Sequence, residues 1–181
     1  MEEISTDGLP LYGLVHCAGI EKTQPFRTTT EDELDETFAV NFRAFWHLIQ
    51  HFVRRGSHEK EDSRVVAIAS VAGLLGIAGN AAYSASKGAL IALIRSLAVE
   101  YAPKNIRFNC LCPGYVETPM LEKAKTLFPS NEAFNAQIVG KHPLGLGQPE
   151  DIAQAAAFLL GPGGRWATGM AMSLDGGYSC T

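Results

Sequence analysis

The stretch RVVAIASVAGLLGIAGNAAYSASKGALIALIRSLAVEYA, residues 64–102, decides the fold. It begins with a β-branched apolar run, Arg64–Ser70, which predicts a buried strand. A glycine-rich loop over residues 71–80 follows. Apolar residues then recur at helical spacing over Ala81–Ala102, and Pro103 ends the helix. The stretch therefore predicts a strand, loop and helix unit of an α/β protein.

Further elements of the same two kinds flank this unit. We expect strands at Leu11–Cys17, Ile106–Leu111 and Met170–Leu174, and helices at Thr30–Arg55 and Ile152–Leu160. Thr30 and Glu33 fit a capping box for the first of these helices. Alternation of strands and helices implies right-handed crossovers and a parallel sheet covered on both faces. The prediction is one domain, residues 1–181, with a doubly wound, Rossmann-like α/β fold.

Composition narrows the function classes. Fifteen basic and nineteen acidic residues give a net charge of −4, which argues against a nucleic-acid partner. Met1–Pro10 is not a signal peptide by composition, and no apolar run is long enough for a bilayer, so we expect a cytoplasmic protein without a membrane partner. The four cysteines lack zinc-site spacing and are expected to be buried reduced thiols, and no metal is expected.

Tyr83 and Lys87 carry the chemistry that the sequence offers. They lie four residues apart near a helix start, so they share one face. An ammonium group one turn away should lower the pKa of the phenol and make it a general acid/base. Ser70, at the end of the preceding strand, could donate a hydrogen bond to the reacting oxygen. A lone Tyr-x-x-x-Lys is usually only a solvated helix face, but small residues around this pair leave room for a ligand.

Ser70–Leu90 resembles the active-site segment of the short-chain dehydrogenase/reductase family. Other segments resemble the family in the same order along the chain. They are His16–Gly19 (HCAG), Val40-Asn41, Asn109–Met120 (NCLCPGYVETPM), Pro143–Ala153 (PLGLGQPEDIA) and Thr168–Gly177 (TGMAMSLDGG).

The resemblance implies hydride transfer between NAD or NADP and a small-molecule carbonyl/alcohol substrate. It implies that Tyr83 is the acid/base, that Lys87 lowers its pKa and binds the nicotinamide ribose, and that Ser70 polarises the substrate. Asn41 would hold a water that links Lys87 to solvent. The remaining cofactor-binding positions implied are Ala18, Gly19, Pro113, Gly114, Val116 and Thr118. Two of these residues have simpler readings: Asn41 could bend its helix or bond a loop, and Thr118 could only start a turn.

The family's glycine-rich segment, T-G-x-x-x-G-x-G, is absent from the printed sequence. We therefore expect an N-terminally truncated sheet, with Leu11–Cys17 as a bare apolar edge and no seat for the adenosine half of the cofactor. A truncated product, a fragment, or a chain completed by another polypeptide would each explain this.

Two functions from different classes remain. The first is an enzyme, whose Tyr115–Lys141 segment suggests a partly apolar substrate. The second is a truncated, non-catalytic oligomerisation partner of a full-length short-chain dehydrogenase. A homo-oligomer, dimer or tetramer, is expected through the helices at Thr30–Arg55 and Ala81–Ala102. His142 is expected to be a surface or loop residue, and we expect no catalytic role for His16.

Overall fold

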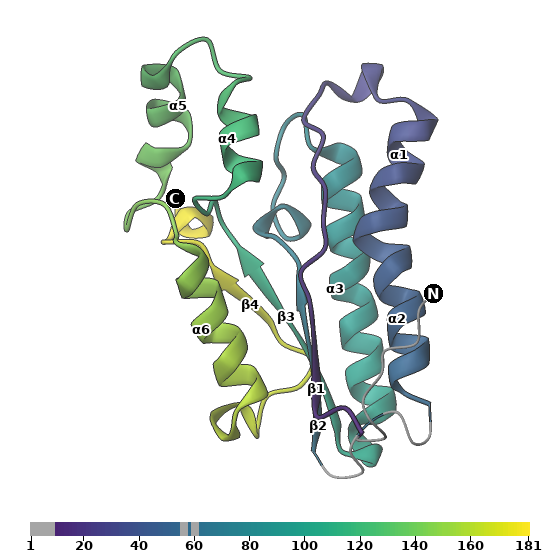
Figure 1. Ribbon diagram of the computed structural model, residues 1–181. Coiled ribbons are helices and arrows are strands. Elements are labelled where there is room, and N and C mark those ends of the chain that lie inside the picture. Colours follow the sequence, from purple (N-terminus) through teal and green to yellow (C-terminus); the bar gives the residue numbers. More distant parts are fainter. Residues whose placement is uncertain (1–9, 55–57, 59–61) are drawn as a thin grey trace.

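The computed structural model describes residues 10–54, 58 and 62–181. Four parallel strands form one sheet in the order β1-β2-β3-β4, and α-helices pack against it (Figure 1). The strands are β1 (Gly13–His16), β2 (Ser63–Ile68), β3 (Ile106–Pro113) and β4 (Ala171–Leu174). The α-helices are α1 (Glu31–Phe38), α2 (Ala44–Phe52), α3 (Ala81–Tyr101), α4 (Pro119–Lys125), α5 (Asn131–Gln137) and α6 (Pro149–Leu160).

Helices cover both faces of the sheet, as the alternating pattern predicted. α1, α2 and α3 lie on one side, and α6 lies on the other (Figure 1). A hydrophobic core lies on each face of the sheet. Neighbouring residues of β2 belong to different cores, because successive side chains of a strand point to opposite faces. Val65 packs in the core with α2 and α3, whereas Val66 packs with Leu159 of α6. The doubly wound α/β prediction is therefore confirmed.

The strand predictions differ from the structure at their ends. β1 is shorter than the predicted Leu11–Cys17, whereas β3 continues past Leu111 to Pro113. β1 lies at the edge of the described sheet, where Tyr12 and Val15 are 51% and 39% exposed. The carboxyl ends of β1, β2 and β3 all point toward the same edge, because the strands are parallel. This edge is where an open α/β sheet binds ligands.

The helix predicted over Thr30–Arg55 is interrupted. Its start has the predicted capping box between Thr30 and Glu33. A π-helical segment, η2 (Ala39–Arg43), then separates α1 from α2 and contains the buried Asn41. Single π-helical turns inside α-helices are frequent at functional sites. Asn41 thus lies where the helix is distorted, which agrees with the simpler interpretation that this residue bends its helix.

Candidate active site

Ser70 begins the loop that follows β2. Its hydroxyl oxygen accepts a 3.1 Å hydrogen bond from the backbone N–H of Ala72, which caps the short 3-10 turn η3 (Val71–Gly73). Gly73 closes this turn against α3, because a Cβ on Gly73 would lie 2.9 Å from the Lys87 carbonyl carbon and 3.0 Å from the Gly88 nitrogen. The glycine therefore allows the Ser70 loop to touch the backbone of α3 at the level of Lys87.

Tyr83 and Lys87 lie one turn apart on the buried face of α3. They are 8% and 3% exposed, so neither belongs to a solvated helix surface. The Lys87 Nζ lies 5.6 Å from the centre of the Tyr83 ring and donates a 2.8 Å hydrogen bond to the carbonyl oxygen of Ile68. Ile68 is the last residue of β2, so Lys87 ties α3 to the end of that strand.

Burial dominates the ionisation of both groups. It raises the pKa of Tyr83 to about 12, although a hydrogen bond with Ser70 acts in the opposite direction. Burial also lowers the pKa of Lys87 to about 8. The sequence predicted that Lys87 would lower the pKa of the phenol, and in this structure the net shift is upward. The reason is desolvation, which disfavours the phenolate and the ammonium group alike.

Asn41 lies beneath the turn that follows β1 and is fully buried. Its Oδ1 accepts a 2.8 Å hydrogen bond from the Ile20 N–H, and its Nδ2 donates 2.9 Å to the Ile20 carbonyl oxygen. The same Nδ2 donates 3.0 Å to the Ser86 hydroxyl oxygen. Both amide N–H groups are therefore used by protein partners. This agrees with the loop-bonding alternative for Asn41.

Ala18 and Gly19 form the turn between β1 and Ile20. A Cβ on Gly19 would lie 3.3 Å from the Lys87 Nζ and 3.6 Å from the Asn41 Oδ1. The turn thus brings its backbone close to the lysine, while Ala18 remains exposed. Three segments that are distant in the sequence therefore converge at Lys87: the turn after β1, the end of β2 and the start of α3.

The remaining predicted cofactor-binding residues lie at the end of β3 and just after it. Pro113 is the last residue of β3 and is buried. A Cβ on Gly114 would lie 2.9 Å from the Cα of Asp175, so this position accepts only glycine without rearrangement. Thr118 caps α4, since its Oγ1 accepts a 3.4 Å hydrogen bond from the Leu121 N–H. Thr118 also donates 3.2 Å to the Val116 carbonyl oxygen, which matches its simpler interpretation as a turn residue.

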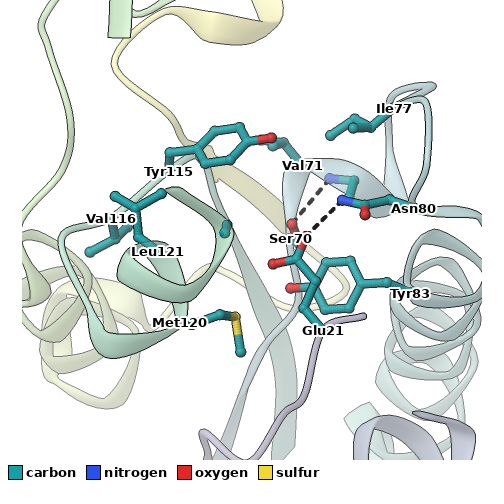
Figure 2. A pocket seen from close by; sticks show the side chains of 13 residues that line it. Glu21, Ser70, Val71, Ile77, Asn80, Tyr83, Tyr115, Val116, Met120 and Leu121 are labelled. Atoms are coloured by element: carbon teal, nitrogen blue, oxygen red, sulfur yellow. Dashed lines mark hydrogen bonds between the residues drawn. The ribbon is translucent and has the colours of Figure 1, made fainter. Parts of the chain in front are cut away.

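A pocket opens between the Ser70 loop and α4, with side chains from both sides directed into it (Figure 2). Of the sequence-predicted residues it contains Ser70, Tyr83, Gly114 and Val116. The remaining lining residues come from several elements: Glu21, Val71, Ala72, Ile77, Asn80, Tyr115, Met120, Leu121 and Ala124.

Sequence reasoning named few of these additional residues as part of the site. In the Tyr115–Lys141 segment, from which a partly apolar substrate was predicted, the apolar residues Met120 and Leu121 line the pocket. Phe134 and Ile138 do not line the pocket but pack with the buried Leu121 in a small core. Glu21 was missed entirely, although a carboxylate two residues after the Gly19 turn was a usable signal.

Two simpler predictions hold only in part. His142 lies in a loop before α6 as predicted, but it is 4% exposed and is not on the surface: its Nδ1 lies 2.8 Å from the Ile138 carbonyl oxygen, and its ring stacks on Tyr178. Two of the four thiols, Cys110 and Cys112, are buried as predicted, but Cys17 and Cys180 are exposed.

Residues 10–54, 58 and 62–181 offer neither a three-ligand metal site nor a membrane-spanning helix. In that part of the chain no group of three His, Cys, Asp or Glu residues could hold a metal ion. None of the described helices is long and apolar enough to cross a membrane.

Comparison with known proteins assigns the family. Residues 1–179 match the sequence model of a family described as enoyl-(acyl carrier protein) reductase. The inactive 2-(S)-hydroxypropyl-CoM dehydrogenase 2 of Xanthobacter autotrophicus is 37% identical over 171 residues, which cover 94% of this chain and 74% of that protein. The 3-oxoacyl-[acyl-carrier-protein] reductase of Aggregatibacter actinomycetemcomitans is 31% identical, over 92% of this chain and 66% of that protein.

The chain is also similar to solved structures of dehydrogenases. A 4-hydroxyisoleucine dehydrogenase mutant, complexed with NADH and succinate, superimposes with a TM-score of 0.88 at 31% identity. The superposition covers 97% of this chain and 71% of that protein. The chain spans between about half and three quarters of the length of the curated relatives it matches. The catalytic-type motifs, the parallel sheet and these matches lead to one conclusion: the chain belongs to the short-chain dehydrogenase/reductase family.

Proposed function

We propose that this chain contributes to hydride transfer between NAD or NADP and a small-molecule carbonyl or secondary alcohol. The observation that supports this most strongly is the meeting of Ser70 and Tyr83 in one pocket, with the Lys87 ammonium group buried behind them. A bound nicotinamide supplies the hydride donor or acceptor in this chemistry. The chain's own residues then have to bind the substrate oxygen and to move one proton.

Tyr83 is proposed as the group that moves the proton. In the reducing direction its phenol donates a proton to the carbonyl oxygen while the carbonyl carbon receives the hydride. In the oxidising direction its phenolate accepts the proton of the alcohol. Because the pKa of Tyr83 is raised to about 12, the phenol form dominates at neutral pH, which suits the reducing direction. The Ser70 hydroxyl is proposed to donate a hydrogen bond to the same substrate oxygen.

The nicotinamide half of the cofactor fits the residues that are present. Gly19 leaves open the space that a Cβ would fill 3.3 Å from the Lys87 Nζ, and a ribose hydroxyl could approach the ammonium group there. We propose that Ala18, Gly19, Lys87 and the segment containing Pro113, Gly114, Val116 and Thr118 hold the nicotinamide and its ribose. Asn41 is proposed as a positioning residue, because its amide holds Ile20 and Ser86 in place.

Steady-state kinetics with a panel of ketones and reduced nicotinamide test the proposal. Tyr83→Phe should lower kcat by a factor of about a hundred or more, as expected for the loss of general acid catalysis. Tyr101→Phe, at the other end of α3, is the matched control and should leave kcat within about twofold of the wild type. Binding of reduced nicotinamide, followed by its fluorescence, should weaken in Lys87→Met. A Tyr83→Phe protein with unchanged turnover would contradict the proposal. One relative is inactive by name, so this test has to be made on the chain itself.

We also propose that copies of the chain associate through α1, α2 and α3. Trp46 of α2 and Val99 of α3 are 43% and 79% exposed and supply apolar surface on these helices. Light scattering at several concentrations checks the mass. Trp46→Glu should shift the mass toward that of a monomer, while Glu122→Gln, at an exposed position of α4 outside these helices, should not.

A further inference from the structure

We propose that Glu21 makes the catalytic pocket selective for a cationic substrate, an amine-bearing ketone or alcohol. This inference rests on the proposed function, since it names the substrate class of the same site. Glu21 lines the pocket together with Ser70 and Tyr83, and Figure 2 shows its side chain directed into the pocket in front of Tyr83.

The Glu21 carboxylate is held in place by neutral partners. Its Oε1 accepts hydrogen bonds from the Asn80 Nδ2 at 2.8 Å and from the Thr23 Oγ1 at 3.2 Å. The single Thr23 hydroxyl proton is shared with the Asn80 Oδ1, which lies closer, at 2.9 Å, and Asn80 is only 4% exposed. The hydrogen bonds therefore fix one oxygen and orient the other. Within the part of the chain that the structure describes, Oε2 accepts no hydrogen bond.

Glu21 has no ion-pair partner among the residues that the structure describes. Among residues 10–54, 58 and 62–181, no Lys, Arg or His nitrogen lies within 4.0 Å of its carboxylate. The neighbouring Lys22 instead pairs with Glu36 of α1. A carboxylate that is fixed in a half-buried pocket without a counter-ion favours a ligand that brings the counter-ion itself.

The field of this carboxylate reaches the catalytic phenol. Burial is the main reason for the raised pKa of Tyr83, and the negative charge of Glu21 adds to it. Tyr115, on the opposite side of the pocket, is affected in the same direction by burial first and by Glu21 as a smaller contribution. A cation bound at Glu21 would offset this repulsion and so make the phenolate easier to form.

The rest of the pocket specifies the body of the ligand. One wall of the pocket is apolar and is formed by Val116, Met120, Leu121 and Ala124. A substrate with an ammonium group at one end and a compact hydrocarbon body would match the carboxylate and this wall together. A dianionic or carboxylate-bearing substrate would be repelled by Glu21.

A pair of isosteric ketones tests the proposal by calorimetric titration of the purified chain. The probes are the 1,1-dimethyl-4-oxopiperidinium ion and 4,4-dimethylcyclohexanone, which differ in having a quaternary nitrogen or a quaternary carbon. We expect the cation to bind the wild-type chain at least about tenfold more tightly than the neutral ketone, which is the scale of one net ion pair in a pocket. Glu21→Gln should remove this preference, because the amide keeps an oxygen for Asn80 but loses the charge.

The control variants separate charge from folding. Glu122→Gln changes the net charge equally at a side chain that is 70% exposed and outside the pocket, and it should keep the preference. Glu21→Asp retains the charge and should keep part of it. Equal affinities in the wild type, binding of neither probe, or a preference that persists in Glu21→Gln would each overturn the proposal. Because binding is measured without turnover, this result is independent of the kinetic effect of Tyr83→Phe.

Discussion

The side-chain amide of Asn41 forms two hydrogen bonds with the backbone of Ile20, to its N–H at 2.8 Å and to its carbonyl oxygen at 2.9 Å. A buried amide that pairs with both backbone polar groups of one residue replaces the hydrogen bonds that a neighbouring β-strand would make. The Asn41 amide connects the π-helical segment η2 to the turn after β1. Gly19 in that turn lies close to Lys87. The position of the turn therefore depends on a residue more than twenty positions away.

Asn41→Ala should destabilise the fold. The substitution leaves the Ile20 N–H and carbonyl groups without their partner, at a cost of about 1–3 kcal/mol for each buried group that stays unpaired. Urea denaturation followed by circular dichroism should show a loss of at least about 2 kcal/mol. Asn135→Ala, at an exposed position of α5, is the control and should change stability by less than about 0.5 kcal/mol. Equal stabilities of the two variants would contradict the assigned role.

Gly73→Ala should separate the Ser70 loop from α3. The added Cβ would lie 2.9 Å from the Ile91 Cδ1 and 2.9 Å from the Lys87 carbonyl carbon, and the backbone atom cannot move aside. Overpacking of this kind costs about 1–3 kcal/mol. Gly76→Ala, in the same loop, meets no atom within 4 Å and serves as the matched control. Thermal unfolding should show a lower Tm for the first variant only, and a lower Tm for both would contradict the steric explanation.

The sequence was sufficient for the architecture because the periodic signals were strong. β-branched runs and the capping box at Thr30 located the strands and a helix start, and parallel strand order followed from their alternation with helices. Bending of the helix at Asn41 was one of the alternatives, but its π-helical form was not predictable, since that form depends on tertiary hydrogen bonds to Ile20. Hydrophobic periodicity alone would have continued the helix without interruption.

The candidate site was predicted less completely than the fold. Tyr83, Lys87 and Ser70 follow from spacing and from the family resemblance, and the structure brings them together. Glu21 and Asn80 enter the site through loops whose paths are set by long-range contacts, such as the backbone bond from the Gln24 nitrogen to the Gly79 carbonyl oxygen. The upward shift in the pKa of Tyr83 also required the structure, because burial cannot be read from a spacing of four residues.

Lys87 should make stability depend on pH. Burial lowers its pKa to about 8 in the folded chain, from an ordinary value of 10.5. Between these values the unfolded chain binds more protons than the folded chain, so stability rises with pH from about 8 upward and is lost again as pH falls through 8. The gain could reach the order of 3 kcal/mol. Lys87→Met should remove this rise in urea denaturation between pH 7 and about 9.5, and the exposed Lys123→Met should retain it. A parallel pH dependence of wild type and Lys87→Met would contradict the assignment.

Glu21→Gln should lower the pKa of Tyr83. Burial, which is the main cause of the raised value of about 12, remains in the variant, but the repulsion between the carboxylate and the phenolate is removed. We expect a downward shift, because a nearby like charge disfavours the phenolate and the variant removes that charge. NMR of chains labelled with ¹³C at the tyrosine Cζ resolves the phenol, and Tyr83→Phe identifies its signal. Above pH 10 the phenolate fraction of Tyr83 should be larger in Glu21→Gln than in the wild type, while Glu122→Gln should match the wild type. An unchanged or higher pKa in Glu21→Gln would mean that the carboxylate does not act on the phenol, and the electrostatic link between substrate charge and proton transfer would then be lost.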